Sequence, residues 1–386
     1  MVDAKQIATQ PSEVDIDAER LEELFAAVQR DVDEGRLPSA QVALGRGGRL
    51  AGMRSFGEAT QGGTRGPVSD QTLYCFYSVS KGVSASMAWA LIEEGLLRPE
   101  ERVGEIVPAL AEAPLAAVTV EQLLTFTCGF PEAPMHPRLW EDRQARVERM
   151  KGWRLMWEPG SRYEYHHTSA HWLLGEIVAQ RTGKDFRDYF RERIALPAGL
   201  PDLYLGLPDE QHGRVADVEF VQAPAEAGGG EVTAETTIHF NYPQQRRGGA
   251  PAGGVYTTAG DIALYYQVLV NGGQALDGTR VLAPETISEA TRVHTQEHHV
   301  DAAHGVPANR GWSIAVAGDD GNAHLRGFGD GAPPRAFGHG GLGGQIGLGD
   351  PDSGLSLAFC TNGITPPDEI TERTRALASL AWRCAV

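Results

Sequence analysis

The chain has 386 residues, 41% hydrophobic and 22% charged, a composition typical of a folded, enzyme-sized protein and unlike that of disordered or fibrous chains. Its net charge of −17 argues against a nucleic-acid or anionic-membrane partner, because binding to phosphates needs clustered Lys and Arg. No apolar run reaches the roughly 18 residues of a membrane span, and the N-terminus has no signal-peptide core. We therefore expect a cytoplasmic protein.

Four cysteines are spread widely along the chain, at Cys75, Cys128, Cys360 and Cys384. None belongs to a C-x-x-C pair, so the pattern indicates neither a disulfide framework nor a zinc knuckle. We expect four free thiols.

The first hundred residues contain a helix, a hairpin and a second helix. Apolar residues at helical spacing predict an amphipathic helix over 16–35, which ends at a glycine before Pro38. Two short apolar runs, 39–44 and 49–56, are joined by a Gly-rich turn and predict a β-hairpin. A helix follows from Ser78, with apolar residues every four positions up to Gly95.

The rest of the chain changes from helical to strand-like character. We expect helices at 118–124, 138–150, 170–181, 259–271, 284–292 and 370–382, and strands at 311–316, 345–348 and 355–360. Strands at both ends with helices between them predict an α/β domain of the α+β type, made from residues 1–96 and 250–386, with an antiparallel sheet covered by helices. Residues 97–249 would form a mainly helical domain with a long irregular loop at 205–249, since that stretch is rich in Gly, Pro and acidic residues.

Ser78 and Lys81 are the first candidate catalytic residues. They stand three residues apart at the start of the second helix, so their side chains share a helix face. A serine hydroxyl needs a base to become a nucleophile, and a lysine whose pKa is lowered by burial can be that base. The alternative without a catalytic role is a serine near a helix start, followed one turn later by a solvated lysine.

Tyr165 is a candidate for a second proton-transfer group. It lies in the segment 163–169, between a Pro-Gly turn and an apolar helix. A phenol can take or return a proton if a nearby cation lowers its pKa from about 10. Alone, the same tyrosine would more simply be a core residue with a satisfied hydroxyl.

A third motif is the Gly-rich stretch 337–344, which contains His339, Gly341 and Leu342. Glycines let the backbone approach a substrate closely, and one N–H here could complete an oxyanion hole. The alternative is a plain turn with a solvated histidine.

Together the three motifs resemble those of the serine β-lactamase-like hydrolases, most closely class C β-lactamases and family VIII carboxylesterases. Residues 78–81 match the family's Ser-x-x-Lys. Residues 165–167 stand where Tyr-x-Asn is usual, and residues 339–341 stand where lactamases carry Lys-Thr-Gly and many esterase relatives His-x-Gly. The stretches 123–129 and 253–258 are similar to connecting segments of the family, so the resemblance covers nearly the whole chain.

The resemblance implies that Ser78 attacks a carbonyl, that Lys81 takes its proton, and that Tyr165 shuttles the proton to the leaving group. The backbone N–H groups of Ser78 and Leu342 would hold the oxyanion. His339 would lie near the substrate and could support the tyrosine, a role that a lysine fills in the lactamases.

Two departures from the family pattern favour an ester as the substrate. Lactamases use the Asn of Tyr-x-Asn and the Lys of Lys-Thr-Gly to hold an amide and a carboxylate, whereas this chain has His167 and His339. A neutral histidine supplies no fixed cation at pH 7. An ester needs less leaving-group activation and has no carboxylate to anchor, so we expect an esterase acting on a small-molecule ester. A β-lactamase, a D-Ala peptidase and an acyltransferase on the same scaffold remain alternatives, and the oligomeric state stays open.

Three other hypotheses compete with the serine hydrolase. Residues 294–298 fit the inverted zincin pattern H-x-x-E-H, but the stretch is polar and follows a helix that is ending, so we expect no metal and no cofactor. Two strings near G-x-S-x-G, at 311–315 and 354–358, lie in expected strands rather than at a strand-to-helix turn. A non-enzymatic protein that is acylated without turnover is the third possibility.

Overall fold

The computed structural model describes residues 2–222 and 233–386, and its centre is a seven-stranded sheet with the strand order β10-β11-β12-β13-β1-β2-β3. Every neighbouring pair in this sheet is antiparallel. The strands are β1 Ser39–Arg46, β2 Arg49–Gln61, β3 Thr64–Pro67, β10 Ala315–Val316, β11 Phe337–Gly340, β12 Ile346–Gly349 and β13 Leu355–Thr361. Strands from the two ends of the chain meet where β1 pairs with β13.

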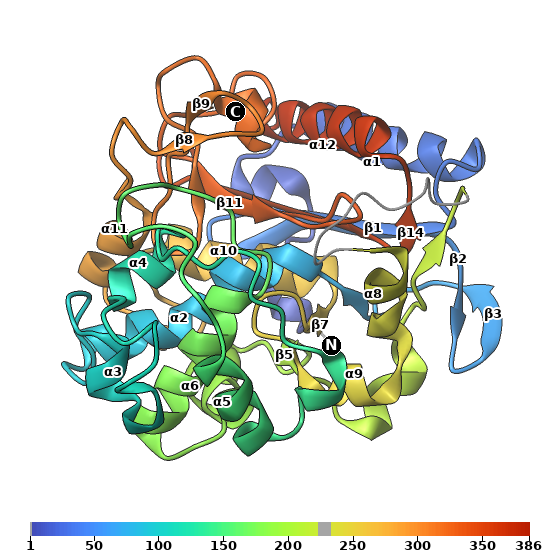
Figure 1. The fold of residues 1–386 in the computed structure, drawn as a ribbon. Coiled ribbons are helices and arrows are strands. Elements are labelled where there is room, and N and C mark those ends of the chain that lie inside the picture. Colours follow the sequence, from blue (N-terminus) through green and yellow to red (C-terminus); the bar gives the residue numbers. More distant parts are fainter. Residues whose placement is uncertain (1, 223–232) are drawn as a thin grey trace.

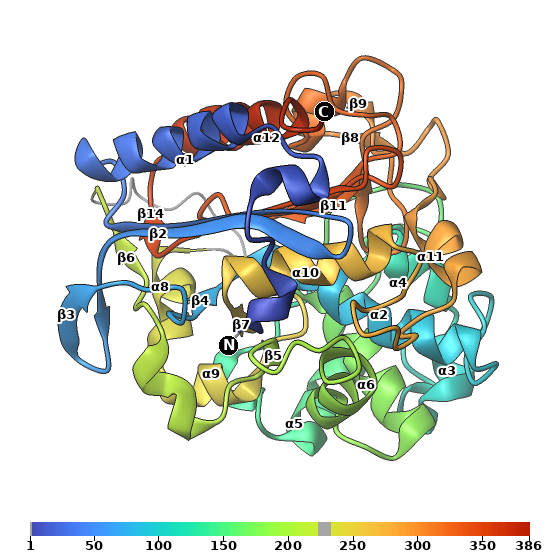
Figure 2. The same cartoon turned by 180° about the vertical axis from the view of Figure 1, so that it is seen from behind.

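Helices cover both faces of the sheet. Helices α1 (Ala18–Asp33) and α12 (Pro367–Trp382) lie side by side on one face, and α10 (Ala259–Val270) crosses the other (Figures 1 and 2). Alternate residues of a strand point to opposite faces. In β13, Leu357 and Phe359 therefore enter the core under α1 and α12, whereas Ala358 and Cys360 enter the larger core on the α10 side.

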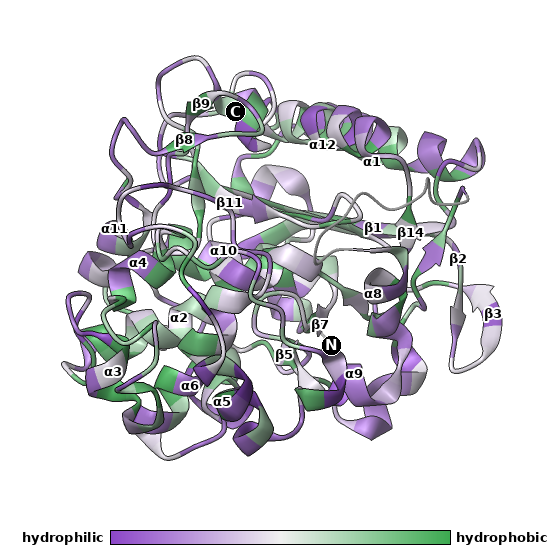
Figure 3. Cartoon of the chain, in the orientation of Figure 1, coloured by the Kyte–Doolittle hydropathy of each residue, from purple (hydrophilic) through white to green (hydrophobic). Residues whose placement is uncertain are grey.

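Helix α2 (Ser80–Glu93) runs through the middle of the molecule, between the sheet with α10 and a largely helical region. All residues from Ser80 to Leu91 are buried, so this helix is apolar on every side apart from a few residues with partners. Figure 3 shows polar residues gathered on outer helices such as α5 and α9. The remaining helices are α3 Val103–Ile106, α4 Val120–Leu124, α5 Arg143–Lys151, α6 Ser169–Thr182, α7 Phe186–Phe190, α8 Ala234–Ile238, α9 Pro243–Gly248 and α11 Pro284–Thr291.

Short strands complete the fold around α2. β7 (Val255–Thr257) pairs with both β4 (Tyr74–Cys75) and β5 (Tyr204–Leu205), which joins three distant stretches of the chain directly beside the start of α2. The other small pairs are β6 Glu219–Phe220 with β14 Gly363–Ile364, and β8 Val300–Asp301 with β9 Val306–Pro307.

The expected fold class is confirmed, with an antiparallel sheet flanked by helices and a further helical region. The domain boundaries at 96/97 and 249/250 stay a prediction. All four cysteines are free, as expected, and the structure shows that all four are buried. Within residues 2–222 and 233–386, no helix is long and apolar enough to cross a membrane.

Two expectations about local structure are wrong in part. The strand expected at 311–316 begins only at Ala315, because Ser313 has a left-handed backbone with φ of 60° that breaks the extended chain. The stretch 205–249 is not irregular throughout: it contains the end of β5, β6, α8, α9 and a 3₁₀ segment at Asp209–Arg214, while its residues 223–232 lie outside the described part of the chain. Short elements of this kind leave little periodicity in a sequence.

Candidate active site

A strained turn presents Ser78 at the entrance to α2. Ser78 lies in the 3₁₀ turn Tyr77–Val79, and Tyr77 before it has φ of 42°, a left-handed conformation that is costly for a bulky residue. Contacts around Tyr77 hold this conformation: its hydroxyl donates to the carbonyl of Thr237 at 3.3 Å, and its ring packs edge-on against Phe240 at 5.0 Å. The turn leaves Ser78 partly exposed between two buried neighbours.

Lys81 is fully buried and lies beside Ser78. Its Nζ donates to Ser78 Oγ at 3.0 Å and to the carbonyl of Ala252 at 3.2 Å, and it lies 4.8 Å from the centre of the Tyr165 ring. The Ser-x-x-Lys spacing thus produces the contact that the sequence predicts, and the backbone at Ala252 adds a partner that the sequence did not indicate.

The loop 250–254 is tied to α2 at several points. Ser84 donates to the carbonyl of Pro251 at 2.7 Å, and Val255 N–H donates to Ser80 Oγ at 3.0 Å. These bonds place the Ala252 carbonyl over Lys81. The Gly-Gly-rich stretch at 253–258 therefore has a physical role in the site, since it fixes an acceptor for the lysine.

Tyr165 faces Ser78 and Lys81 from the segment before α6. Its hydroxyl is buried and makes no hydrogen bond within the described residues, although Ser78 lies near enough to favour the phenolate. Burial raises the pKa of Tyr165 to about 12, against the opposing effects of Ser78 and of Arg310. A buried phenol whose hydroxyl has no hydrogen-bond partner in the described chain is suited to exchange a proton with a bound substrate.

His339 lies beside Tyr165 but as a neutral group. The two ring centres are 5.7 Å apart, and His339 Nδ1 donates to the carbonyl of Gly340 at 2.6 Å. Burial, followed by the charges of Arg310 and Lys81, holds the pKa of His339 well below its usual range. Its Nε2 is buried without a partner in the described chain, so a bound substrate or water could use this atom.

His167 stands at the edge of the site, with its ring edge-on to Tyr165 at 5.2 Å. Its pKa is lowered, first by partial desolvation and then by the Lys81 charge, but the side chain is exposed and solvent limits the effect. His167 thus lies beside Tyr165, as expected of the residue that stands two positions after it in the motif.

His166, which sequence reasoning did not single out, orients the segment that carries Tyr165. Its Nδ1–H donates to the carbonyl of Glu164 at 2.6 Å, and its Nε2 accepts from the N–H of Phe130 at 3.1 Å and lies 3.2 Å from Cys128 Sγ. Burial lowers the pKa of His166 to about 4. The neutral ring fixes the chain on either side of it, so its role is structural.

The loop 341–344 lies against the turn that carries Ser78, because β11 contacts residues 77–79. Gln345 shapes this loop: its backbone carbonyl accepts from Gly341 N–H at 2.8 Å, and its side-chain carbonyl accepts from Gly343 N–H at 2.9 Å. A Cβ at Gly341 would lie 2.8 Å from the carbonyl oxygen of Phe76, so only glycine permits this approach. The N–H groups of Ser78 and Leu342 make no hydrogen bond among the described residues and are available to an oxyanion.

Arg310 is a second residue that sequence reasoning missed, and it places beside Tyr165 a cation that neither His167 nor His339 supplies. Its guanidinium carbon lies 5.7 Å from the centre of the Tyr165 ring. The residue follows a long loop and belongs to no motif, so nothing in the sequence links it with Tyr165.

The histidine-rich segment does not form a zinc site. Residues 294–298 are not helical, and both ring nitrogens of His294 face other acceptors, the Glu121 carboxylate at 3.2 Å and the Glu289 carbonyl at 2.8 Å. No group of three potential ligands converges within the part of the chain that the structure describes.

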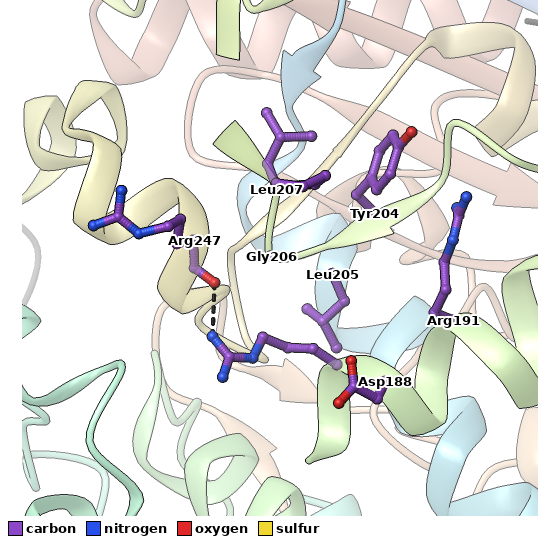
Figure 4. Close-up of a pocket in the computed structure, with 9 residues that line it drawn as sticks. Asp188, Arg191, Tyr204, Leu205, Gly206, Leu207 and Arg247 are labelled. Atoms are coloured by element: carbon purple, nitrogen blue, oxygen red, sulfur yellow. Dashed lines mark hydrogen bonds between the residues drawn. The ribbon is translucent and has the colours of Figure 1, made fainter. Parts of the chain in front are cut away.

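A surface pocket of about 300 Å³ lies away from Ser78, between α7, the strand β5 and Arg247 (Figure 4). Arg187 and Arg247 line it, but Arg187 pairs with Asp185 and Arg247 pairs with Glu141 and Asp209. Arg191, the third arginine of the pocket, donates to the carbonyl of Pro201 and lies over the Tyr204 ring. None of the lining residues is a serine, cysteine, histidine or lysine, so the pocket has no pair of nucleophile and base like Ser78 and Lys81.

The fold and the arrangement of serine, lysine and tyrosine define a serine hydrolase. The chain belongs to the β-lactamase family, whose family model matches residues 24–381. The "Putative D-alanyl-D-alanine carboxypeptidase" of Escherichia coli strain K12 is 26% identical over 386 aligned residues, which cover 91% of this chain and 84% of that protein. The "Esterase/beta-lactamase LipL" of Mycobacterium tuberculosis strain H37Rv is 28% identical, over 79% of this chain and 73% of that protein. A crystal structure of a family VIII carboxylesterase is 25% identical with a TM-score of 0.78, over 96% of this chain and 98% of that one.

Proposed function

We propose that this protein is a carboxylesterase that cleaves small esters through an acyl group bound to Ser78. The proposal rests mainly on one observation, the contact of 3.0 Å between the buried Lys81 Nζ and Ser78 Oγ. The Tyr165 hydroxyl lies next to this contact and has no hydrogen-bond partner among the described residues. Nucleophilic catalysis by serine requires a base at this distance. We also expect no metal, no nucleic-acid partner and a cytoplasmic location.

In the first half of the reaction, Ser78 Oγ attacks the ester carbonyl and its proton passes to a neutral Lys81. The N–H groups of Ser78 and Leu342 hold the oxyanion that forms, and such donors are commonly worth 10²–10³-fold in rate. The C–O bond to the alcohol then breaks, and the alkoxide leaves as the alcohol with a proton delivered by way of Tyr165.

In the second half, water attacks the acyl group and gives up a proton to the Tyr165 and Lys81 pair. The bond to Ser78 breaks, the serine oxygen regains a proton, and the carboxylic acid leaves. An alcohol in place of water would give a new ester, so acyl transfer uses the same intermediate.

A second candidate is a D-alanyl-D-alanine carboxypeptidase, the activity in the name of the Escherichia coli relative. Arg310 favours this candidate, because a fixed cation near Tyr165 could hold a substrate carboxylate. The esterase is supported by the family VIII structure and by the Mycobacterium tuberculosis relative, and an ester needs less activation of its leaving group than an amide.

The two functions are separated by steady-state kinetics with three substrates: p-nitrophenyl butyrate, an acylated D-Ala-D-Ala peptide and a chromogenic cephalosporin. We expect kcat/KM to be highest for the ester and to fall by at least about 100-fold in Lys81→Ala, the lower range for loss of a proton-transfer group. Lys151→Ala is the control, since Lys151 is exposed and pairs with Glu148. Faster turnover of the peptide or cephalosporin than of the ester would reject the esterase.

A further inference from the structure

Arg310 lies among three aromatic rings beside the candidate site, and hydrogen bonds hold both its side chain and its backbone. Its guanidinium carbon lies 5.8 Å from the ring centre of Tyr163, 5.9 Å from that of Phe126 and 5.7 Å from that of Tyr165. Its Nε donates to the Tyr163 hydroxyl at 2.9 Å. The backbone is fixed as well, since Arg310 N–H donates to Thr295 Oγ1 at 3.0 Å.

No carboxylate neutralises this guanidinium at close range. Arg310 makes no ion pair within residues 2–222 and 233–386, and Asp301 acts on it only as a weaker and more distant charge. Most other arginines of the described chain, such as Arg143 with Glu176, pair with an acid. A positive charge without a close counter-ion, in a partly buried place, raises the electrostatic potential at its neighbours.

Tyr165 is the neighbour whose protonation state this electrostatic potential can change. The groups that face it are Lys81 from α2, the Ser78 hydroxyl, His339 from β11, His167 from its own segment, and Arg310. The pKa values of His339 and His167 are lowered, so these rings carry no charge at neutral pH. His166 and His171, which pack behind the site against Phe126, also have lowered pKa values.

We propose that Arg310 is the positioning residue that keeps the Lys81 and Tyr165 pair in its proton-accepting state, a neutral lysine beside a phenol, the role that the resemblance assigned to residue 339. The inference rests on the proposed function, because it concerns proton transfer from Ser78. Arg310 never touches the reacting atoms in this account. It acts through Tyr165, and Tyr163 holds it in place.

The test is the pH dependence of one chemical step at Ser78, its reaction with a fluorophosphonate followed by intact mass. In this step the serine oxygen bonds to phosphorus, the P–F bond breaks, fluoride leaves, and the serine proton passes to the Lys81 and Tyr165 pair. Protonation of that pair stops the reaction, so the acid limb of the rate profile reports the apparent pKa of the pair.

Removing a nearby positive charge favours protonation of the Lys81 and Tyr165 pair. In Arg310→Gln the acid limb of the rate profile is therefore expected to move to higher pH, by roughly one pH unit. The rate on the plateau above that limb should stay within about threefold of wild type, because only charge is lost. Arg310→Lys should restore most of the position of the limb, and Tyr163→Phe should give a smaller upward shift.

Arg162→Gln is the matched control, since Arg162 is an exposed arginine three positions before Tyr165 and pairs with Glu164. It should leave the limb in place. An unchanged limb in Arg310→Gln, or a plateau depressed equally at every pH, would overturn the inference. A loss confined to carboxylate-bearing esters, with an unchanged pH profile on p-nitrophenyl butyrate, would also overturn it and make Arg310 a substrate anchor. If wild type itself fails to react, the proposed function fails instead.

Discussion

The substitution Gly254→Ala is expected to damage the site from a position that touches no substrate. A Cβ at Gly254 would lie 2.5 Å from the nitrogen of Ala250, and 2.8 Å and 2.9 Å from backbone atoms of Gly249. Because all three neighbours are backbone, no side chain can turn aside to relieve the contact. The chain must move by about 0.9 Å to restore ordinary contact at 3.4 Å.

That movement falls on the loop 250–254, which carries the carbonyl of Ala252. Its hydrogen bond from Lys81 Nζ is already 3.2 Å long, so a shift of this size breaks it. Overpacking of this kind costs roughly 1–3 kcal/mol of stability. A misplacement near 1 Å of a positioning group can cost about 100-fold in rate, so we expect kcat/KM to fall by about 10- to 100-fold.

The assays are urea unfolding and kcat/KM on p-nitrophenyl butyrate. Gly66→Ala is the control, since nothing lies within 4 Å of a Cβ built at Gly66 and its backbone is not left-handed. If Gly254→Ala matched Gly66→Ala in both unfolding midpoint and rate, the loop would not position Lys81 and the reasoning would be refuted.

Three further predictions concern the tyrosine, the buried histidine and the histidine-rich segment. Tyr165→Phe keeps the ring against Lys81 but removes the hydroxyl, so kcat should fall by about 10²–10⁴-fold with little change in unfolding midpoint; an unchanged kcat would exclude Tyr165 from proton transfer. Folding depresses the pKa of His166 from 6.5 to about 4, so below pH 6.5 the unfolded chain takes up a proton that the folded chain refuses. Stability should therefore fall by about 2 kcal/mol between pH 6.5 and pH 5 on account of this group, and His166→Asn should show a shallower dependence in urea unfolding at a series of pH values; equal slopes would contradict the assignment. Because both ring nitrogens of His294 already face acceptors, EDTA should leave ester hydrolysis unchanged, and a loss reversed by zinc would revive the metal hypothesis.

The elements with a strong hydrophobic periodicity could be predicted from the sequence. Their predicted bounds differ from those in the structure by only a few residues. The helix expected at 16–35 is α1, Ala18–Asp33, and the expected hairpin is the pair β1 and β2. The strand expected at 355–360 is β13, in which Leu357 and Cys360 alternate between two cores. Long periodic segments carry this information because burial of one face selects the period.

The part of the site that depends on local spacing could also be predicted. Ser78 and Lys81 are three residues apart, so helix geometry alone brings them into contact. Tyr165 needed the resemblance, because 84 positions separate it from Lys81 and only the fold joins them.

The contacts that sequence reasoning missed are long-range and have no motif. Arg310 reaches Tyr163 across 147 positions, and the carbonyl of Ala252 reaches Lys81 across 171 positions. The left-handed backbone at Tyr77 was equally hidden, because a tyrosine rarely adopts it and only tertiary contacts hold it. Each of these features depends on how distant segments pack, which periodicity and spacing do not report.

The measurement that tests the central claim most directly is intact mass after brief mixing with p-nitrophenyl butyrate, alongside release of p-nitrophenol, for wild type, Ser78→Ala and Ser86→Ala. Ser86 lies on the same helix α2, and its hydroxyl is bonded within that helix, so Ser86→Ala controls for the loss of a hydroxyl. Wild type and Ser86→Ala should release p-nitrophenol over many turnovers through a butyryl adduct, and Ser78→Ala should show neither adduct nor turnover. Turnover by Ser78→Ala at the wild-type rate, or an adduct on another residue, would contradict the account.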